Sequence, residues 1–152
     1  MRSACFVDTN VLVYPYDPRE PTKAVIARSL IGAIQDRAAG VVSVQVLGEL
    51  FRTLSRLMAG PAATHAAAEV VEYYASFWEV CPLAVETVLE GMHGAIGYRL
   101  HFWDALIWAT AKRHGLTLVL SEDFGDGWEF EGVLFRNPFL EGFELDAALS
   151  EA

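Results

Sequence analysis

The chain has 152 residues, of which 53% are hydrophobic and 20% are charged, and this composition excludes a disordered polypeptide. It predicts one compact domain over residues 1–152. Twenty acidic residues against eleven basic ones give a formal charge of −9, which excludes a generally basic nucleic-acid coat.

The first half of the chain is expected to start with a strand and continue with helices. Ala4–Val7 is a short apolar run that ends in polar residues, as a buried parallel strand does. Apolar residues then recur at helical spacing between positions 24 and 34. Val41–Val42 predicts a very short strand, and Ser43 can cap a helix whose apolar stripe runs over 46–58.

The second half of the chain continues the alternation of helices and strands. The expected elements are a helix over about 62–77, a short strand-like run at 80–83, helices over about 85–98 and 103–114, a buried strand at 116–120 and, after a Gly-rich turn, a strand at 133–135. This order predicts a three-layer α/β/α sandwich with a central, mainly parallel sheet, whose ligands bind at the carboxyl ends of the strands.

Two acidic residues are expected at that end of the sheet. Asp8 directly follows the first strand, and Asp123 follows the strand at 116–120. Helix capping or turn formation is the simple alternative for Asp8. If the two strands are neighbours, the two carboxyl groups lie close together.

Two further acidic residues lie on predicted helices. Asp104 begins the helix at 103–114, which is apolar nearly all round, so its carboxyl group needs a cation, hydrogen bonds or the helix N-terminus as a partner. Glu49 is less distinctive, because Arg52 and Arg56 follow at spacings that allow a salt-bridged surface.

If the four acids converge, their mutual repulsion raises some of their pKa values and calls for a divalent cation at neutral pH. An all-oxygen ligand set favours Mg²⁺, with Mn²⁺ as a substitute, over zinc. Among the histidines, His101 lies three positions before Asp104, where capping or packing is favoured over contact with a substrate phosphate.

Four segments, in this order and spacing, resemble a PIN-domain ribonuclease, specifically a VapC-type toxin. They are FVDTNVLVY at 6–14, QVLGEL at 45–50, WDALI at 103–107 and LSEDF at 120–124, and the similarity extends to RNPF at 136–139. The resemblance implies a small α/β/α sandwich, Mg²⁺-dependent endonuclease activity on RNA, homodimerisation and inhibition by a small antitoxin protein.

The resemblance also assigns roles by position. Asp8, Glu49, Asp104 and Asp123 match the four acids of the family, and Asn10 and Ser121 match the polar residues beside them. As a hypothesis, Asp8, Asp104 and Asp123 hold Mg²⁺, and Glu49 orients or deprotonates the attacking water or helps to bind a second ion. Glu122 and Asp126 are weaker candidates, because the side chain of Glu122 is expected to point away from that of Asp123.

An RNA substrate requires cationic groups, which this acidic chain has few of. The candidates for an RNA-facing rim are Arg52, Arg56, Arg99, Lys112 and Arg113, for which ordinary surface charge is the alternative.

Other enzyme classes fit less well. A haloacid dehalogenase phosphatase needs a second Asp two positions after Asp8, where this chain has Asn10. A receiver-like phosphoacceptor needs a Lys after a later strand, and neither Lys23 nor Lys112 is so placed. A PIN-like module that binds RNA or an antitoxin with little turnover is the alternative that remains open.

The remaining features concern location and partners. Asp8 and Asn10 interrupt the N-terminal apolar run, so no membrane span or signal peptide is expected and the location is expected to be cytoplasmic. Cys5 and Cys81 lack metal-binding spacing and are predicted to be core thiols. A mean hydropathy of +0.29 favours an apolar surface that meets another chain.

The acidity of the chain is concentrated at the C-terminal end. Residues 121–152 contain nine acidic residues and a single basic one, Arg136. A basic partner, a bound cation or a solvated acidic surface would each account for this pattern.

Overall fold

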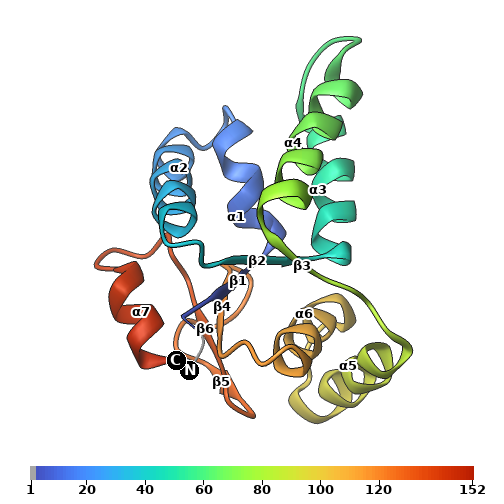
Figure 1. The fold of residues 1–152 in the computed structure, drawn as a ribbon, viewed down its shortest axis with the longest axis vertical. Helices are drawn as coiled ribbons and strands as arrows, with labels where there is room; N and C mark the ends of the chain where they lie inside the picture. The colour runs from blue at the N-terminus through green and yellow to red at the C-terminus, as the bar shows by residue number, and fades with distance from the viewer. Residues whose placement is uncertain (1–2) are drawn as a thin grey trace.

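The computed structural model describes residues 3–152, which form a six-stranded sheet and the helices around it (Figure 1). The strands are β1 (Cys5–Val7), β2 (Gly40–Ser43), β3 (Glu79–Cys81), β4 (Leu118–Leu120), β5 (Glu129–Phe130) and β6 (Val133–Arg136). The helices are α1 (Thr9–Val13), the 3-10 helix η1 (Tyr14–Tyr16), α2 (Pro21–Asp36), α3 (Val44–Leu57), α4 (Ala63–Phe77), α5 (Val85–Tyr98), α6 (Phe102–Arg113) and α7 (Leu145–Glu151).

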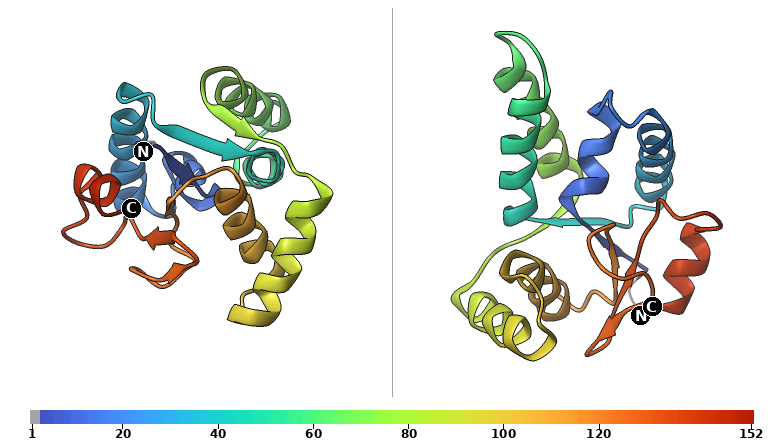
Figure 2. Two further views of the ribbon diagram at one scale, coloured as in Figure 1. Left: turned by 60° about the horizontal axis from the view of Figure 1, so that its bottom comes forward. Right: turned by 180° about the vertical axis from the view of Figure 1, so that it is seen from behind.

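The sheet is the middle layer of a three-layer sandwich, as the sequence predicts. The strand order is β3-β2-β1-β4-β6-β5, and every neighbouring pair is parallel except β5 and β6. Helices α1 to α4 cover one face, α5 and α6 cover the other, and α7 lies beside α2 (Figures 1 and 2).

The order of the strands places a ligand site between β1 and β4. The chain runs from β1 outward to β2 and β3, then returns to add β4 on the opposite side of β1. Val7 of β1 is paired with Leu120 of β4, so the two strands end side by side. In open α/β sheets, such a reversal of direction opens a crevice at the carboxyl ends of the strands.

Apolar packing fixes this arrangement. The residues of β1 and β4 are fully buried, as expected for central parallel strands that are covered on both faces. Cys5 and Cys81 are buried in β1 and β3, consistent with core thiols. In α6, the segment Ala105–Ala111 is buried because the sheet lies on one side of it and α5 on the other.

Besides the 3-10 helix η1, three short elements have no counterpart among the sequence-based expectations. The apolar residues of α1 form a single capped turn of helix rather than a periodic segment. The two-residue strand β5 forms a hairpin with β6 through Glu131 and Gly132, both of which have positive φ. Helix α7 buries only Leu145 and Ala148, too few residues for an apolar stripe.

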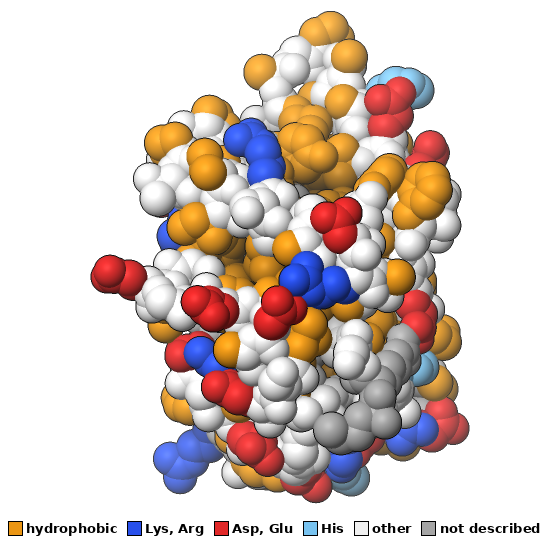
Figure 3. Space-filling view, turned by 60° about the vertical axis from the view of Figure 1, so that its left-hand side comes forward, with side chains coloured by type: hydrophobic (Ala, Val, Ile, Leu, Met, Phe, Trp, Pro, Cys, Tyr) orange, Lys and Arg blue, Asp and Glu red, His pale blue; other side chains and the backbone are white. Residues whose placement is uncertain are grey.

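The acidic C-terminal segment pairs with three basic side chains from elsewhere in the chain and with its own Arg136. The ion pairs are Lys23–Glu122, Arg37–Asp146, Lys112–Glu131, Arg136–Asp126 and Arg136–Glu151. Other carboxylates remain at the surface, and Figure 3 shows acidic side chains spread over the face on the side of α2 and α7. Much of the acidity is therefore neutralised within the fold.

Within residues 3–152, every helix falls short of the length and apolar character that crossing a bilayer requires.

Two glycines of α5 provide a test of how α5 packs on α6. A Cβ at Gly94 would lie 2.5 Å from Cζ3 of the rigid Trp108 ring, whereas a Cβ at Gly97 would meet nothing within 4 Å. Gly94→Ala is expected to destabilise the protein by about 1–3 kcal/mol through overpacking. Gly97→Ala is expected to stabilise it by up to about 1 kcal/mol through helix propensity. Urea unfolding of both variants checks the pair, and equal effects would contradict the close packing.

Candidate metal and nucleic-acid site

Asp8 lies at the end of β1 and is both the N-cap of α1 and the most buried acid of the site. Its Oδ1 accepts a hydrogen bond from the backbone N–H of Thr9 (2.8 Å), and its Oδ2 accepts one from the Ser121 hydroxyl (2.7 Å). The residue is 4% exposed. Capping, considered above as an alternative to a site role, thus coexists with a place in the cluster.

Asn10 links the end of β1 to the loop after β4. Its amide Nδ2 lies 3.3 Å from Oδ2 of Asp8, 3.1 Å from Oγ of Ser121 and 3.1 Å from Oδ2 of Asp123. Ser121 Oγ also accepts a hydrogen bond from the backbone N–H of Asp123 (3.1 Å). The structure therefore brings together four of the predicted residues, and the amide N–H groups of Asn10 point at two carboxylates.

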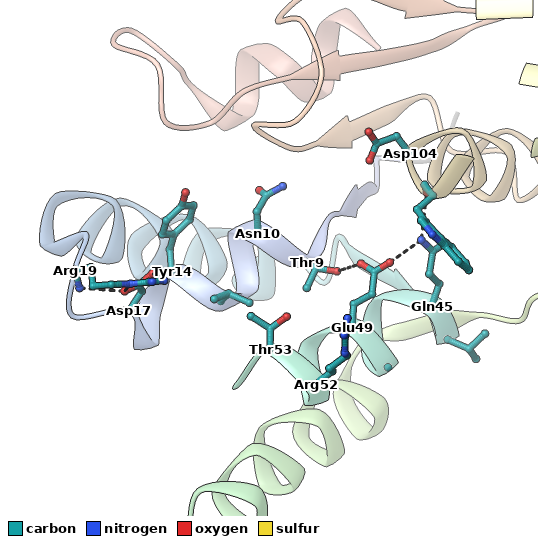
Figure 4. A pocket seen from close by; sticks show the side chains of 14 residues that line it. Thr9, Asn10, Tyr14, Asp17, Arg19, Gln45, Glu49, Arg52, Thr53 and Asp104 are labelled. Atoms are coloured by element: carbon teal, nitrogen blue, oxygen red, sulfur yellow. Dashed lines mark hydrogen bonds and ion pairs between the residues drawn. The ribbon is translucent and has the colours of Figure 1, made fainter. Parts of the chain in front are cut away.

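Glu49 enters the site from α3, which Ser43 caps as predicted. Its carboxylate accepts a hydrogen bond from the Thr9 hydroxyl (2.7 Å) and another from the Gln45 side-chain amide (2.8 Å). The salt bridges to Arg52 and Arg56, which the spacing allowed as an alternative, are absent from the described part of the chain, and Glu49 turns toward α1 (Figure 4).

Asp104 lies in the first turn of α6 and is half-buried. Its carboxyl group points across the pocket toward the side from which Asn10 projects (Figure 4). Among residues 3–152 no side chain or backbone group donates a hydrogen bond to it. Burial raises the pKa of Asp104, and the nearby Asp123 and Glu49 carboxylates raise it further, whereas His101 lowers it.

These acids border a large open pocket with a volume of about 840 Å³. Its walls come from α1, η1 and the loop after it, α3 and the start of α6 (Figure 4). The lining residues are Thr9, Asn10, Val13, Tyr14, Asp17, Arg19, Val44, Gln45, Gly48, Glu49, Arg52, Thr53, Trp103 and Asp104. Asp8 and Asp123 are not part of this lining, but both contact Asn10, which is.

Burial and the repulsion between neighbouring carboxylates raise the pKa values of Asp8 and Asp104. Burial, with a smaller contribution from the Asp123 and Glu49 carboxylates, raises the pKa of Asp8 to about 7, against the opposing effect of the hydrogen bonds from Ser121 and Thr9. A cation between the carboxylates would relieve both burial and repulsion.

The donor set fits Mg²⁺ chemically, since Asp8, Asp104, Asp123 and Glu49 offer only oxygen ligands. As the side chains stand in residues 3–152, no three acidic, His or Cys side chains form a ready-made metal-binding group. Asn10 accounts for part of this, because its amide hydrogens lie between the Asp8 and Asp123 carboxylates. An ion shared by Asp8 and Asp123 would therefore have to replace the amide hydrogens of Asn10 between them.

The weaker acidic candidates lie outside the cluster. Glu122 points away from Asp123, accepting a hydrogen bond from the Tyr14 hydroxyl and forming an ion pair with Lys23 (2.8 Å). Asp126 instead binds Arg136 and the backbone N–H of Asn137.

The predicted basic rim is not gathered in one place. Arg52 lines the pocket, and Arg56 follows one turn further along α3. Arg99 is the left-handed C-cap of α5. Arg113 lies at the far end of α6 from Asp104 and, like Lys112, pairs with Glu90. The structure thus places only Arg52 beside the acids, and RNA binding by these residues stays a prediction.

Sequence reasoning missed three residues of the site. Thr9 and Gln45 hold the Glu49 carboxylate, and Gln45 Nε2 also donates to the backbone carbonyl of Trp103 (3.2 Å). Gln45 lies one helical turn before Glu49, a spacing that favours such a contact. For Trp103, the available signal was a large aromatic side chain directly before Asp104.

A family model for the PIN domain matches residues 5–125, most of the chain. The chain therefore belongs to the PIN-domain family, and the acids at the end of β1, on α3, at the start of α6 and after β4 are its candidate site. Among curated proteins, none matches the sequence.

Solved structures with the same fold include chains from toxin–antitoxin complexes. A toxin–antitoxin complex from Klebsiella pneumoniae is similar at 18% identity and a TM-score of 0.63, over 89% of this chain and 98% of that one. DNA-bound VapBC from Salmonella typhimurium is similar at 17% identity and a TM-score of 0.64, over 89% of this chain and 98% of that one. VapC20 from Mycobacterium tuberculosis, a sarcin–ricin loop cleaving toxin, is similar at 19% identity and a TM-score of 0.62, over 76% of this chain and 87% of that one.

Asp8→Asn is expected to stabilise the metal-free protein at pH 8. The pKa of Asp8 is higher in the folded state than in the unfolded state, so the stability of the wild type falls as the pH rises from about 4 to about 7. The neutral Asn side chain removes this loss, and the difference in Tm between variant and wild type should shrink as the pH is lowered to 4.5.

Thermal unfolding in EDTA checks this expectation, with the exposed Glu141→Gln as a control. A difference in Tm that is the same at every pH would contradict the role of burial.

Proposed function

We propose that this protein is a metal-dependent endoribonuclease that uses Mg²⁺, with Mn²⁺ as a substitute, and acts as the toxin of a toxin–antitoxin pair. The observation that carries the proposal is the convergence of four acids from distant segments on the crevice beside β1 and β4. Similarity to VapC20, described as an RNA-cleaving toxin, supports the choice of RNA. The structural relatives that include an antitoxin support a small antitoxin partner. A cytoplasmic location, expected from the sequence, fits this role.

Asp8, Asp104 and Asp123 would hold the metal ion, directly or through water. Bound there, Mg²⁺ would neutralise the charge that develops on the phosphodiester and make a bound water more acidic. Ser121 and Asn10 hold Asp8 and Asp123 in fixed positions relative to each other through their hydrogen bonds.

Glu49 acts on the attacking water. The Thr9 hydroxyl and the Gln45 amide hold its carboxylate, which orients the water and takes up its proton. In-line attack on phosphorus expels the 3′ oxygen, leaving a 5′-phosphate on one product and a 3′-hydroxyl on the other.

Cleavage of total cellular RNA by the purified protein tests this proposal. Discrete cuts are expected with Mg²⁺, none with EDTA, and a loss of at least 100-fold in rate for Asp8→Asn or Glu49→Gln, in line with removal of a metal ligand or a general base. The control Glu141→Gln should cleave normally. Products with a 2′,3′-cyclic phosphate would contradict the mechanism.

The second candidate is a PIN-like module that binds RNA or an antitoxin with little turnover. The lack of a ready-made three-ligand group in residues 3–152 favours it. Calorimetry separates the two functions, because a module without turnover has no need of Mg²⁺. Mg²⁺ binding that is lost in Asp8→Asn favours the nuclease.

We also propose that the protein is a homodimer that associates through α5. Four side chains at helical spacing, Val85, Leu89, Met92 and Ile96, are between 47% and 78% exposed and form one stripe. The opposite face of α5 packs on α6. A helix that is apolar on both faces is typical of a buried position, which a second copy would provide.

The stripe is suited to pairing with its own copy. Its spacings of four, three and four residues read the same in both directions, so two antiparallel α5 helices set Val85 against the partner's Ile96 and Leu89 against the partner's Met92. Such a pairing also brings Glu86 toward the partner's His93 on the same flank of the helix pair, which sets a carboxylate beside an imidazole that can donate a hydrogen bond to it.

Leu89→Glu combined with Met92→Glu is expected to convert a dimer into a folded monomer, because four charges would be buried at the contact. Sedimentation velocity checks this, with Val25→Glu as the control that should leave the dimer intact, because Val25 is an exposed apolar residue on α2. A monomeric wild type at micromolar concentration would contradict the proposal.

A further inference from the structure

Trp103 is a large aromatic side chain on the wall of the pocket, next to Asp104. It is 55% exposed, although tryptophan is on average a highly buried residue. The ring of Phe102 packs against it edge-on, with centroids 5.2 Å apart. The exposed surface of the indole is thus available to a ligand in the pocket.

The surroundings of Trp103 leave room for a planar group. Val44, which is itself exposed, and Gly48 line the same pocket, and the space beyond the Cα of Gly48 is open for at least 4 Å. Gln45 fixes the distance from this wall to the acids, because its amide donates both to the Trp103 carbonyl (3.2 Å) and to Glu49 (2.8 Å).

A positive group also lines the pocket. Arg52 projects from α3 one turn after Gly48 and is exposed (Figure 4). In the described part of the chain it forms no ion pair, whereas the other arginine of the pocket, Arg19, is bound to Asp17. A ligand that contacts both side chains therefore needs a flat apolar group and a negative group, with its reactive centre at the acids that line the same pocket.

A nucleotide of single-stranded RNA has this combination. We propose that Trp103 is a stacking platform for the nucleobase next to the cleaved phosphodiester, and that Arg52 binds a neighbouring phosphate. This inference rests on the proposed ribonuclease function. Stacking of bases on aromatic side chains holds single strands with little sequence preference, and a free guanidinium pairs readily with phosphate.

The affinity for short RNA tests the platform. All proteins carry Asp8→Asn to prevent cleavage, and the probes are fluorescein-labelled eight-nucleotide RNAs of adenine, cytosine or uracil, followed by anisotropy. Trp103→Leu is expected to weaken binding roughly tenfold, as loss of a stacked base does, and Trp103→Phe much less. The matched control is Trp128→Leu, since Trp128 is 52% exposed but is outside the pocket lining; it should bind normally.

Tryptophan fluorescence gives a second readout that a merely structural role would not change. Unlabelled RNA should quench the emission of a Trp128→Phe protein and leave that of a Trp103→Phe protein nearly unchanged, because Trp78 and Trp108 are buried. Equal RNA affinities of Trp103→Leu and Trp128→Leu, with no difference in quenching, would overturn the proposal that Trp103 stacks on a base. They would favour a protein partner as the ligand of this part of the pocket.

The two levels of the proposal fail differently. If the wild type cleaves RNA and the Trp103 variants bind it normally, only the platform is wrong. If the wild type neither binds nor cleaves RNA, the ribonuclease function is wrong and the platform falls with it.

Discussion

The site depends on one constraint, the burial of the Asp8 carboxyl group where β1 and β4 end side by side. A buried carboxylate needs hydrogen bonds, and the Thr9 N–H and the Ser121 hydroxyl provide them from the two sides of the crevice. Asn10 then ties the same point to Asp123. The hydrogen bonds that stabilise the buried Asp8 carboxylate thus belong to the same network that joins the end of β1 to the loop after β4.

Much of the fold could be predicted from the sequence, because its long elements carry strong periodic patterns. The helix expected over 85–98 has those bounds. Ser43 caps α3, the helix that begins directly after Ser43. The short elements α1, β5 and α7 could not be predicted, since tertiary contacts rather than local pattern hold them. The sequence placed Asp8 and Asp123 close together only if their strands are neighbours, and the pairing of β1 with β4 meets that condition.

The contacts of individual side chains lay beyond the sequence. Spacing along α3 favoured salt bridges from Glu49 to arginines, whereas the fold turns Glu49 toward Thr9, forty positions earlier. Likewise, a basic partner, a cation or a solvated surface would each have accounted for the acidic C-terminal segment, whereas the fold supplies Lys23, Arg37 and Lys112 from elsewhere in the chain as partners for three of its acids. Such long-range pairings depend on topology, which composition does not contain.

The pairing of β1 with β4 also affects when the site can exist during synthesis. The first strand leaves the ribosome more than a hundred residues before the strand that completes its surroundings, and until β4 arrives Asp8 has neither Ser121 nor Asp123 beside it. Contacts this distant in sequence form late in folding. A nascent chain shorter than about 125 residues therefore carries the first acid but no assembled crevice, so any activity of this site arises only once nearly the whole domain has been translated.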